Sequence, residues 1–202
     1  DVGIAWSGIS YQEANASKTG GLVYLLALVF VFLALAALYE SWGLPLAILM
    51  SVPVAVLGAV LFIAGAHLTD PLFVNNIYMQ ISLVMLIGLA AKNAILVVEY
   101  ADRLFFEEGK SLLEATVGAA RLRVRPIVMT AFAFILGVMP LIFASGVYAT
   151  ARNIMGVALV GGMLFATLLG IFVYPALYYL VGRIGRFERR RERKKELEAE
   201  LK

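Results

Sequence analysis

Three long intervals of this chain carry no charged residue, and they limit the possible folds more than any other feature. They cover residues 41–66, 126–151 and 153–182. A helix that crosses a bilayer needs about 20 predominantly apolar residues, and each interval is long enough. The intervals therefore predict spanning helices and an all-α membrane protein.

The composition supports this class. Hydrophobic residues make up 62% of the chain and the mean hydropathy is +0.89, whereas soluble domains are about 45–50% apolar. The chain has no cysteine, which excludes a disulfide framework and a thiolate metal site. His67 is the single histidine, so neither a zinc site nor a catalytic triad is expected. We expect no cofactor, no metal and no enzymatic activity, and a soluble protein with a large buried core is the disfavoured alternative.

The expected fold is a bundle of five transmembrane helices with a short surface helix and a short extended N-terminal segment. The spans are predicted at residues 21–39, 44–66, 77–100, 126–144 and 153–181. Residues 1–20 are predicted to be the end of a domain outside the membrane, with residues 2–10 extended. Residues 183–202 form a charged tail, expected as a solvated helix or frayed end, with contact to anionic lipid as the alternative. The first residue is Asp1, and we expect the chain to be the C-terminal piece of a longer protein.

Local sequence signals refine two of these elements. Ser111 and Glu114 form a capping-box pattern, which predicts a short amphipathic helix along the membrane surface. Pro126 is expected in the first turn of the fourth span, and Pro53 is expected to kink the second. Four glycines are expected to allow close helix approach: Gly88, Gly156, Gly161 and Gly162.

The basic residues predict the orientation of the bundle. The loops at 67–76 and 145–152 hold one basic residue between them, whereas the loop at 101–125 holds five and the tail holds many more. Lysine and arginine concentrate on the cytoplasmic side. Five spans place the 101–125 loop and the tail on the same side, so the C-terminus is expected in the cytoplasm and residues 1–20 outside.

Lys92 is the strongest candidate for a functional residue. It lies in the middle of the third span, where a charged lysine costs at least ~2.5–3.5 kcal/mol. Snorkelling to an interface would require a reach of ~10 Å or more from there, so a role in an ion or proton pathway, together with Asn93, is favoured. No span carries an aspartate or glutamate near its centre, so partner carboxylates would come from residues outside this chain.

Two more polar residues lie near the start of the fourth span. Thr130 could belong to the same pathway, although a lone threonine in a spanning helix usually bonds the carbonyl four residues earlier, here Pro126. Arg123 and Arg125 flank the entry of this span, where arginines by default anchor to lipid phosphates.

Several segments together resemble the resistance–nodulation–division multidrug exporters of Gram-negative inner membranes. They are Ala-Ala-Leu-Tyr-Glu-Ser-Trp at 36–42, Ile-Gly-Leu-Ala-Ala-Lys-Asn-Ala-Ile-Leu-Val-Val-Glu-Tyr at 87–100, and Arg-Val-Arg-Pro-Ile-Val-Met-Thr from 123 onward. The resemblance covers essentially the whole chain. It implies that the chain is the C-terminal membrane portion of such a pump, preceded by the end of a periplasmic porter segment.

The resemblance also assigns roles to residues. The lysine of the family's Gly-Leu-x-Ala-Lys-Asn motif pairs with two aspartates of the N-terminal half, and Lys92 matches it. The threonine of the Arg-Pro-Ile-x-Met-Thr motif joins that relay and matches Thr130, and the arginine on the cytoplasmic side of the path matches Arg123. Asn93 completes the expected proton relay. Family members often have serine where this chain has Ala131.

A proton/drug antiporter that exports amphiphilic compounds is therefore the expected function. The expected partners are the N-terminal half with its aspartates, further copies in a homotrimer, a periplasmic adaptor, an outer-membrane channel, amphiphilic substrates and the bilayer, but no nucleic acid. The alternatives are a lipid- or protein-export relative of the same superfamily, or a membrane scaffold that does not transport.

Overall fold

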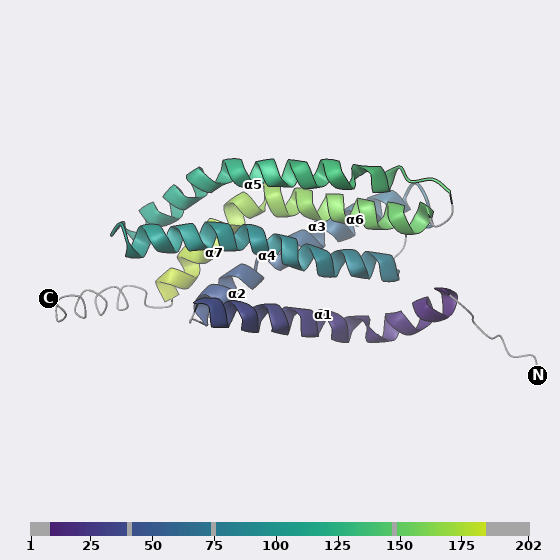
Figure 1. Ribbon diagram of the computed structural model, residues 1–202, viewed down its shortest axis with the longest axis horizontal. Helices are drawn as coiled ribbons and strands as arrows, with labels where there is room; N and C mark the ends of the chain where they lie inside the picture. Colours follow the sequence, from purple (N-terminus) through teal and green to yellow (C-terminus); the bar gives the residue numbers. More distant parts are fainter. Residues whose placement is uncertain (1–8, 40–41, 74–75, 147–148, 185–202) are drawn as a thin grey trace, which may run out of the picture.

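The computed structural model describes residues 9–39, 42–73, 76–146 and 149–184. These residues form seven helices and, within the described ranges, no strand. In chain order the helices are α1 (Ile9–Tyr39), α2 (Gly43–Leu49), α3 (Val52–His67), α4 (Ile77–Phe106), α5 (Leu112–Ile142), α6 (Ala149–Leu168) and α7 (Gly170–Ile184). They lie roughly alongside one another in an elongated bundle (Figure 1).

Five helical stretches are long and apolar enough to cross a membrane. They are Gly21–Tyr39, Gly43–His67, Ile77–Phe106, Leu112–Ile142 and Ala149–Leu168. The predicted fold class, an all-α membrane bundle, is therefore confirmed. The extended segment predicted at 2–10 lies mostly outside the described residues, and its last two residues already belong to α1. The tail from residue 185 onward also lies outside the described ranges.

The second stretch is interrupted where the sequence predicted a kink. Pro53 has no backbone N–H, so the carbonyl of Leu49, four residues earlier, lacks its helical donor. The break between α2 and α3 falls at Met50 and Ser51. The Ser51 N–H and its hydroxyl both donate to the carbonyl of Ile48, which ends α2 with a tight turn.

The surface helix and the fourth span are one continuous helix, which corrects the prediction that they are separate. The capping box at Ser111 is present, because the Ser111 hydroxyl accepts from the Glu114 N–H and the Glu114 carboxylate accepts from the Ser111 N–H. From there α5 continues to Ile142 with Pro126 in its interior rather than in a first turn. An internal proline removes one helical hydrogen bond. Ala119 before it and Ile127 after it are both buried in one core cluster.

The predicted fifth span is also broken. It divides into α6 and α7 at Leu169, six residues before Pro175. Tyr174 crosses this break, and its hydroxyl donates to the carbonyl of Ala166 at 2.9 Å in a buried position. A side chain at Gly170 would collide with the Tyr174 ring, since an added Cβ would lie 2.7 Å from Tyr174 Cε2. Glycine at this position therefore lets the ring fold back over the break.

Small residues bring α6 into close contact with α3 and α5. A Cβ at Gly58 would lie 2.7 Å from the carbonyl oxygen of Gly161, and one at Gly162 would lie 3.0 Å from that of Ala55. A Cβ at Gly156 would approach the backbone nitrogen of Ile142 to 2.9 Å. Three of the four predicted close-approach glycines are thus confirmed. Gly88 differs, because nothing lies within 4 Å of its would-be Cβ.

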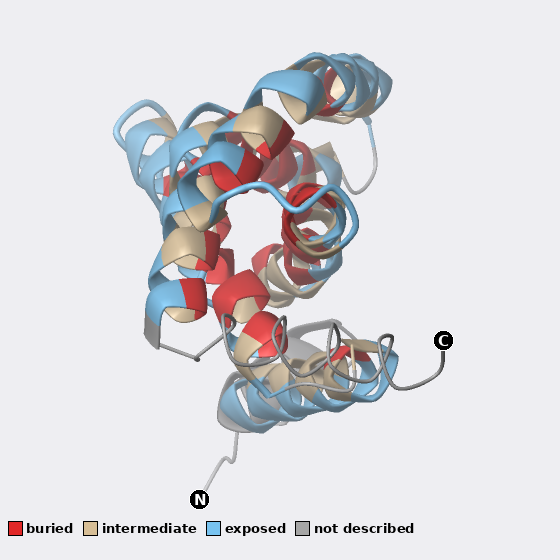
Figure 2. Ribbon diagram, turned by 90° about the vertical axis from the view of Figure 1, so that its left-hand side faces the viewer, coloured by how far each residue is buried: buried red, intermediate tan, exposed pale blue. Residues whose placement is uncertain are grey.

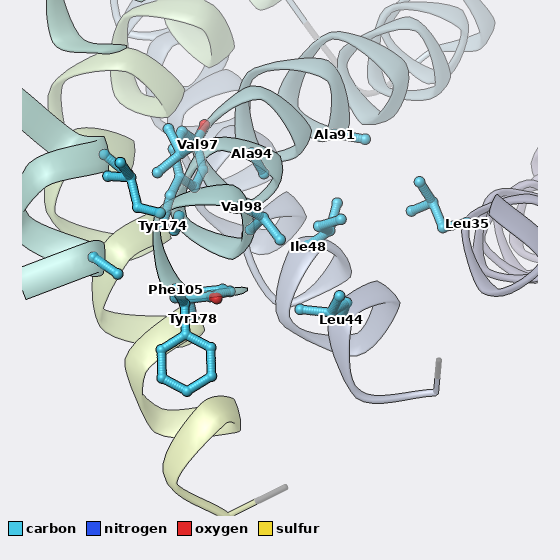
Figure 3. Packing of buried hydrophobic residues seen from close by; sticks show 14 of the residues in the cluster. Leu35, Leu44, Ile48, Ala91, Ala94, Val97, Val98, Phe105, Tyr174 and Tyr178 are labelled. Atoms are coloured by element: carbon cyan, nitrogen blue, oxygen red, sulfur yellow. The ribbon is translucent and has the colours of Figure 1, made fainter. Parts of the chain in front are cut away.

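The buried residues lie on the helix faces that point toward one another, while the outward faces of the bundle are mostly exposed (Figure 2). The largest cluster joins α4 to α2, α5 and α7, and includes Ile48, Val97, Val98, Tyr174 and Tyr178 (Figure 3). The helix α1 is peripheral: only 6% of the residues in its most apolar part are buried, against 56% in the most apolar part of α6. Leu35 is its contribution to the cluster.

Candidate functional site

The central helix α4 has one exposed stripe along its length. An Asn76 cap begins the helix, since the Asn76 side chain accepts from the Met79 N–H at 3.1 Å. Residues three, four or seven positions apart lie on one helix face, and six exposed residues follow this spacing: Ile81, Met85, Gly88, Lys92, Glu99 and Arg103. The opposite faces of α4 are buried against the core clusters. The stripe is therefore the side of α4 that the described helices leave uncovered.

Lys92 lies on this stripe at the centre of the 30-residue helix. Its neighbours on the stripe toward the start of α4 are Gly88, Met85 and Ile81, none of which can pair with a charge. The ion pairs formed by described residues near the end of α4 are Arg103–Glu107 and Lys110–Glu108. Among the described residues, no carboxylate pairs with Lys92.

Thr130 and Lys92 lie at the same level of two adjacent antiparallel helices. The level is fixed by the contact between Arg123 on α5 and Tyr100 on α4. Lys92 lies eight residues before Tyr100, or about 12 Å along α4 at 1.5 Å per residue. Thr130 lies seven residues after Arg123, or about 10 Å in the same direction along α5. The helix pair therefore brings these two predicted site residues to one depth.

Thr130 is exposed on the edge of α5, and its hydroxyl donates to a backbone carbonyl of its own helix. The acceptor is Ile127, three residues earlier, at 3.0 Å. The sequence had suggested Pro126, four residues earlier, as the acceptor of such a bond. The self-satisfying bond expected of a lone threonine is thus present, with a different acceptor, and the Thr130 oxygen still has lone pairs to accept a further hydrogen bond.

Asn93 is not on the Lys92 stripe. Successive residues of a helix point about 100° apart, since 3.6 residues complete a turn, and Asn93 is only 3% exposed. Its amide nitrogen is buried and has no hydrogen-bond partner among the described residues. Asn93 therefore lies inside the bundle, beside Lys92 in sequence but on a different face of α4.

Arg123 lies against an aromatic ring. Its guanidinium carbon is 4.7 Å from the centroid of the Tyr100 ring, within the range of a cation–π contact. Its Nε is buried and has no hydrogen-bond partner among the described residues. The sequence analysis did not identify Tyr100 as a site residue. Its position at the end of the predicted third span, directly after Glu99, is a signal that could have drawn attention to it.

A polar hollow and an apolar hollow lie outside this group of candidate residues. A polar one of about 460 Å³ lies at the end of α4, lined by Glu99, Asp102, Arg103, Phe106 and Glu107. An apolar one of about 640 Å³ lies between α1 and the α2, α3 and α4 helices, with Tyr24 and Pro53 in its wall. The apolar hollow has no charged group in its lining. Within the described ranges, no group of three or more histidine, aspartate or glutamate side chains could hold a metal ion.

The bundle of long apolar helices defines an α-helical membrane protein, and an exposed lysine lies at the centre of its central helix. The chain belongs to the AcrB/AcrD/AcrF family, whose family model matches residues 1–182. The resemblance to the resistance–nodulation–division exporters is thereby confirmed.

Three relatives illustrate the match. The chain is 46% identical over 189 residues to the multidrug resistance protein MdtF of Escherichia coli, covering 93% of this chain and 18% of MdtF. It is 43% identical over 183 residues to the toluene efflux pump membrane transporter TtgB of Pseudomonas putida, covering 91% and 17%. The solvent-resistant pump membrane transporter SrpB of Pseudomonas putida is 42% identical with the same coverage. The chain thus spans less than a fifth of the length of these relatives.

Proposed function

We propose that this chain is the C-terminal membrane portion of a proton/drug antiporter, a secondary active transporter that exports amphiphilic compounds at the expense of the proton gradient. Its relatives are named as multidrug, toluene and solvent efflux pumps. The observation that carries the proposal is Lys92, an exposed lysine at the centre of an apolar spanning helix, without a carboxylate partner among the described residues. Such a residue is expensive in lipid and indicates an ion or proton pathway.

The proposed partners of Lys92 are aspartates of an N-terminal half that packs on the exposed stripe of α4. A lysine that faces deprotonated carboxylates keeps its charge, because their attraction offsets the cost of desolvation. Gly88 lies one turn from Lys92, and nothing lies within 4 Å of its would-be Cβ, so it would let a second helix approach closely. The stripe therefore has both the charge and the small residue that such an interface needs.

Proton uptake by these aspartates would weaken their hold on Lys92. The ammonium group would then need another acceptor at the same depth. Thr130 lies at this level on α5, and its oxygen can accept a hydrogen bond while its proton goes to Ile127. We assign Thr130 as the alternative acceptor in the relay, and Asn93 as a buried polar group behind it. The resulting shift of α4 against the N-terminal half would be transmitted to the parts that bind drug.

Arg123 would hold a fixed positive charge at the cytoplasmic end of this path. A guanidinium group is a permanent cation at physiological pH. Its proposed role is to set the electrostatic potential near the exit. We propose an inner-membrane location in a Gram-negative cell, with the N-terminus periplasmic and the C-terminus cytoplasmic, in keeping with the arginine and lysine distribution.

The proposed assembly is a homotrimer with a periplasmic adaptor and an outer-membrane channel, which would bind through parts of the protein outside this chain. A lipid- or protein-export relative, or a scaffold that does not transport, remains the alternative.

The decisive experiment is Lys92→Ala in the complete gene product that contains this chain. Antiport predicts loss of proton-driven efflux of an amphiphilic dye, with normal amounts of protein in the membrane. Lys110→Ala, at an exposed position after α4, is the matched control and should leave efflux unchanged. Unaltered efflux in the Lys92 variant would refute the proposal. An unsubstituted protein that moves no dye would favour the lipid-export or scaffold alternatives.

A further inference from the structure

The contact between Arg123 and Tyr100 joins the two helices that carry the candidate relay. The guanidinium carbon lies 4.7 Å from the Tyr100 ring centroid. Both side chains are half-buried, and Tyr100 itself packs against the largest core cluster. The ring is therefore anchored by the core of the bundle, while the arginine that it faces comes from the neighbouring helix.

Arg123 differs from the two arginines nearest to it in sequence. Arg121 and Arg125 are exposed, and a shift of two residues turns a side chain about 200° around the helix. Arg123 alone of the three faces α4. Its Nε is buried and has no hydrogen-bond partner in the described part of the chain. The guanidinium group of Arg123 thus lies against the face of the Tyr100 ring.

The face of an aromatic ring can hold a guanidinium group in place without neutralising its charge. The negative quadrupole of the ring attracts a cation without an ion pair, and the attraction grows as water is excluded. A carboxylate at the same place would neutralise Arg123, whereas the ring keeps its full positive charge available. The contact can therefore fix the position of the charge without cancelling its electrostatic effect.

We propose that Tyr100 is a positioning residue of the transporter. Its ring holds the Arg123 guanidinium by a cation–π contact at the cytoplasmic end of the proposed proton path. This inference rests on the proposed antiport function. Tyr100 is not proposed to donate or accept a transferred proton. It acts through Arg123, whose charge it keeps about 10 Å along α5 from Thr130.

The test replaces Tyr100 in the complete protein with phenylalanine, with trifluorophenylalanine and with leucine. Phenylalanine keeps the ring face, fluorination removes most of its negative potential at nearly constant size, and leucine removes the ring. We expect near-normal efflux for Tyr100→Phe, and a loss of about 5- to 30-fold for Tyr100→Leu. The fluorinated variant should fall close to leucine. Efflux equal in the phenylalanine and trifluorophenylalanine variants would overturn the inference, because packing alone would then explain the position.

The same substitutions at Tyr78 provide the matched control. Tyr78 lies at the other end of α4, half-buried against a different cluster, and its fluorination should not change efflux. A loss at Tyr78 equal to that at Tyr100 would also count against a specific role.

A second measurement does not depend on transport. In a double-mutant cycle on thermal stability, Tyr100→Leu should cost less in an Arg123→Gln background than in the unsubstituted protein. Additive effects would refute the contact.

Lys92→Ala, assayed in parallel, separates the positioning role of Tyr100 from the antiport proposal. If Lys92→Ala abolishes efflux while fluorination at Tyr100 has no effect, only the positioning role fails. If it leaves efflux intact, the antiport proposal fails, and the cycle still decides whether Tyr100 holds Arg123.

Discussion

Gly58→Ala should destabilise the bundle at the contact between α3 and α6. A methyl group at Gly58 would lie 2.7 Å from the carbonyl oxygen of Gly161 and 2.7 Å from Cγ of Phe165. The carbonyl belongs to the backbone of α6 and cannot rotate away, so the two helices must separate. Overpacking of this kind costs about 1–3 kcal/mol, and the better helix propensity of alanine returns up to about 1 kcal/mol. We expect a net loss of up to about 2 kcal/mol.

The loss can be measured by thermal unfolding of the 202-residue chain in detergent micelles, followed by far-ultraviolet circular dichroism. A change of 1 kcal/mol shifts Tm by about 2–4 °C in a domain of this size, so Tm should fall by up to about 8 °C. Gly65→Ala is the matched control in the same helix. It is exposed and nothing lies within 4 Å of its would-be Cβ, so its Tm should stay the same or rise. Equal shifts for the two variants would refute the argument that close approach, rather than helix propensity, explains Gly58.

Other predictions concern single hydrogen bonds and the topology. Ser111→Ala removes the capping box of α5 and should cost about 0.5–2 kcal/mol, with faster amide exchange in the first turn of α5. Tyr174→Phe loses the bond to Ala166 and should cost about 1 kcal/mol in the same melts. Asn153→Ala should cost about 1–3 kcal/mol. The amide nitrogen of Asn153 donates to the carbonyl oxygen of Leu141, in the last turn of α5, at 2.9 Å. Single cysteines at Thr69 and Lys110 should react with an impermeant reagent from opposite sides of the membrane. Labelling of both from one side would contradict the five-span topology.

Much of the fold could be predicted from the sequence because lipid imposes a simple rule. A charge-free apolar interval of sufficient length is stable in a bilayer only when its backbone is fully hydrogen-bonded. The five long apolar stretches, the capping box at Ser111 and the close-approach role of Gly161 and Gly162 follow from local patterns of this kind. The candidate residue Lys92 also follows, since a charge in the middle of such an interval is conspicuous without any knowledge of its neighbours.

The helix ends and breaks could not be predicted in the same way. Whether Pro53 or Pro126 interrupts a helix depends on the contacts on each side of it. Ile127 and Ala119 are buried on the two sides of Pro126 and α5 stays continuous. Before Pro53 the helix breaks, and the N–H and hydroxyl of Ser51 donate to the carbonyl of Ile48. Proline costs a similar hydrogen bond in both places, so the proline by itself does not fix the result.

The sequence by itself determined the class of protein, the candidate residues and the family, because these depend on composition and on motifs that are continuous in the chain. Only the tertiary structure decided which side each candidate faces. Asn93 follows Lys92 directly, yet one is buried and the other exposed, and Tyr100 meets Arg123 across a helix pair. A 100° rotation per residue and the position of α5 beside α4 produce these differences. Both depend on how the helices pack, and packing is a property of residues far apart in the sequence.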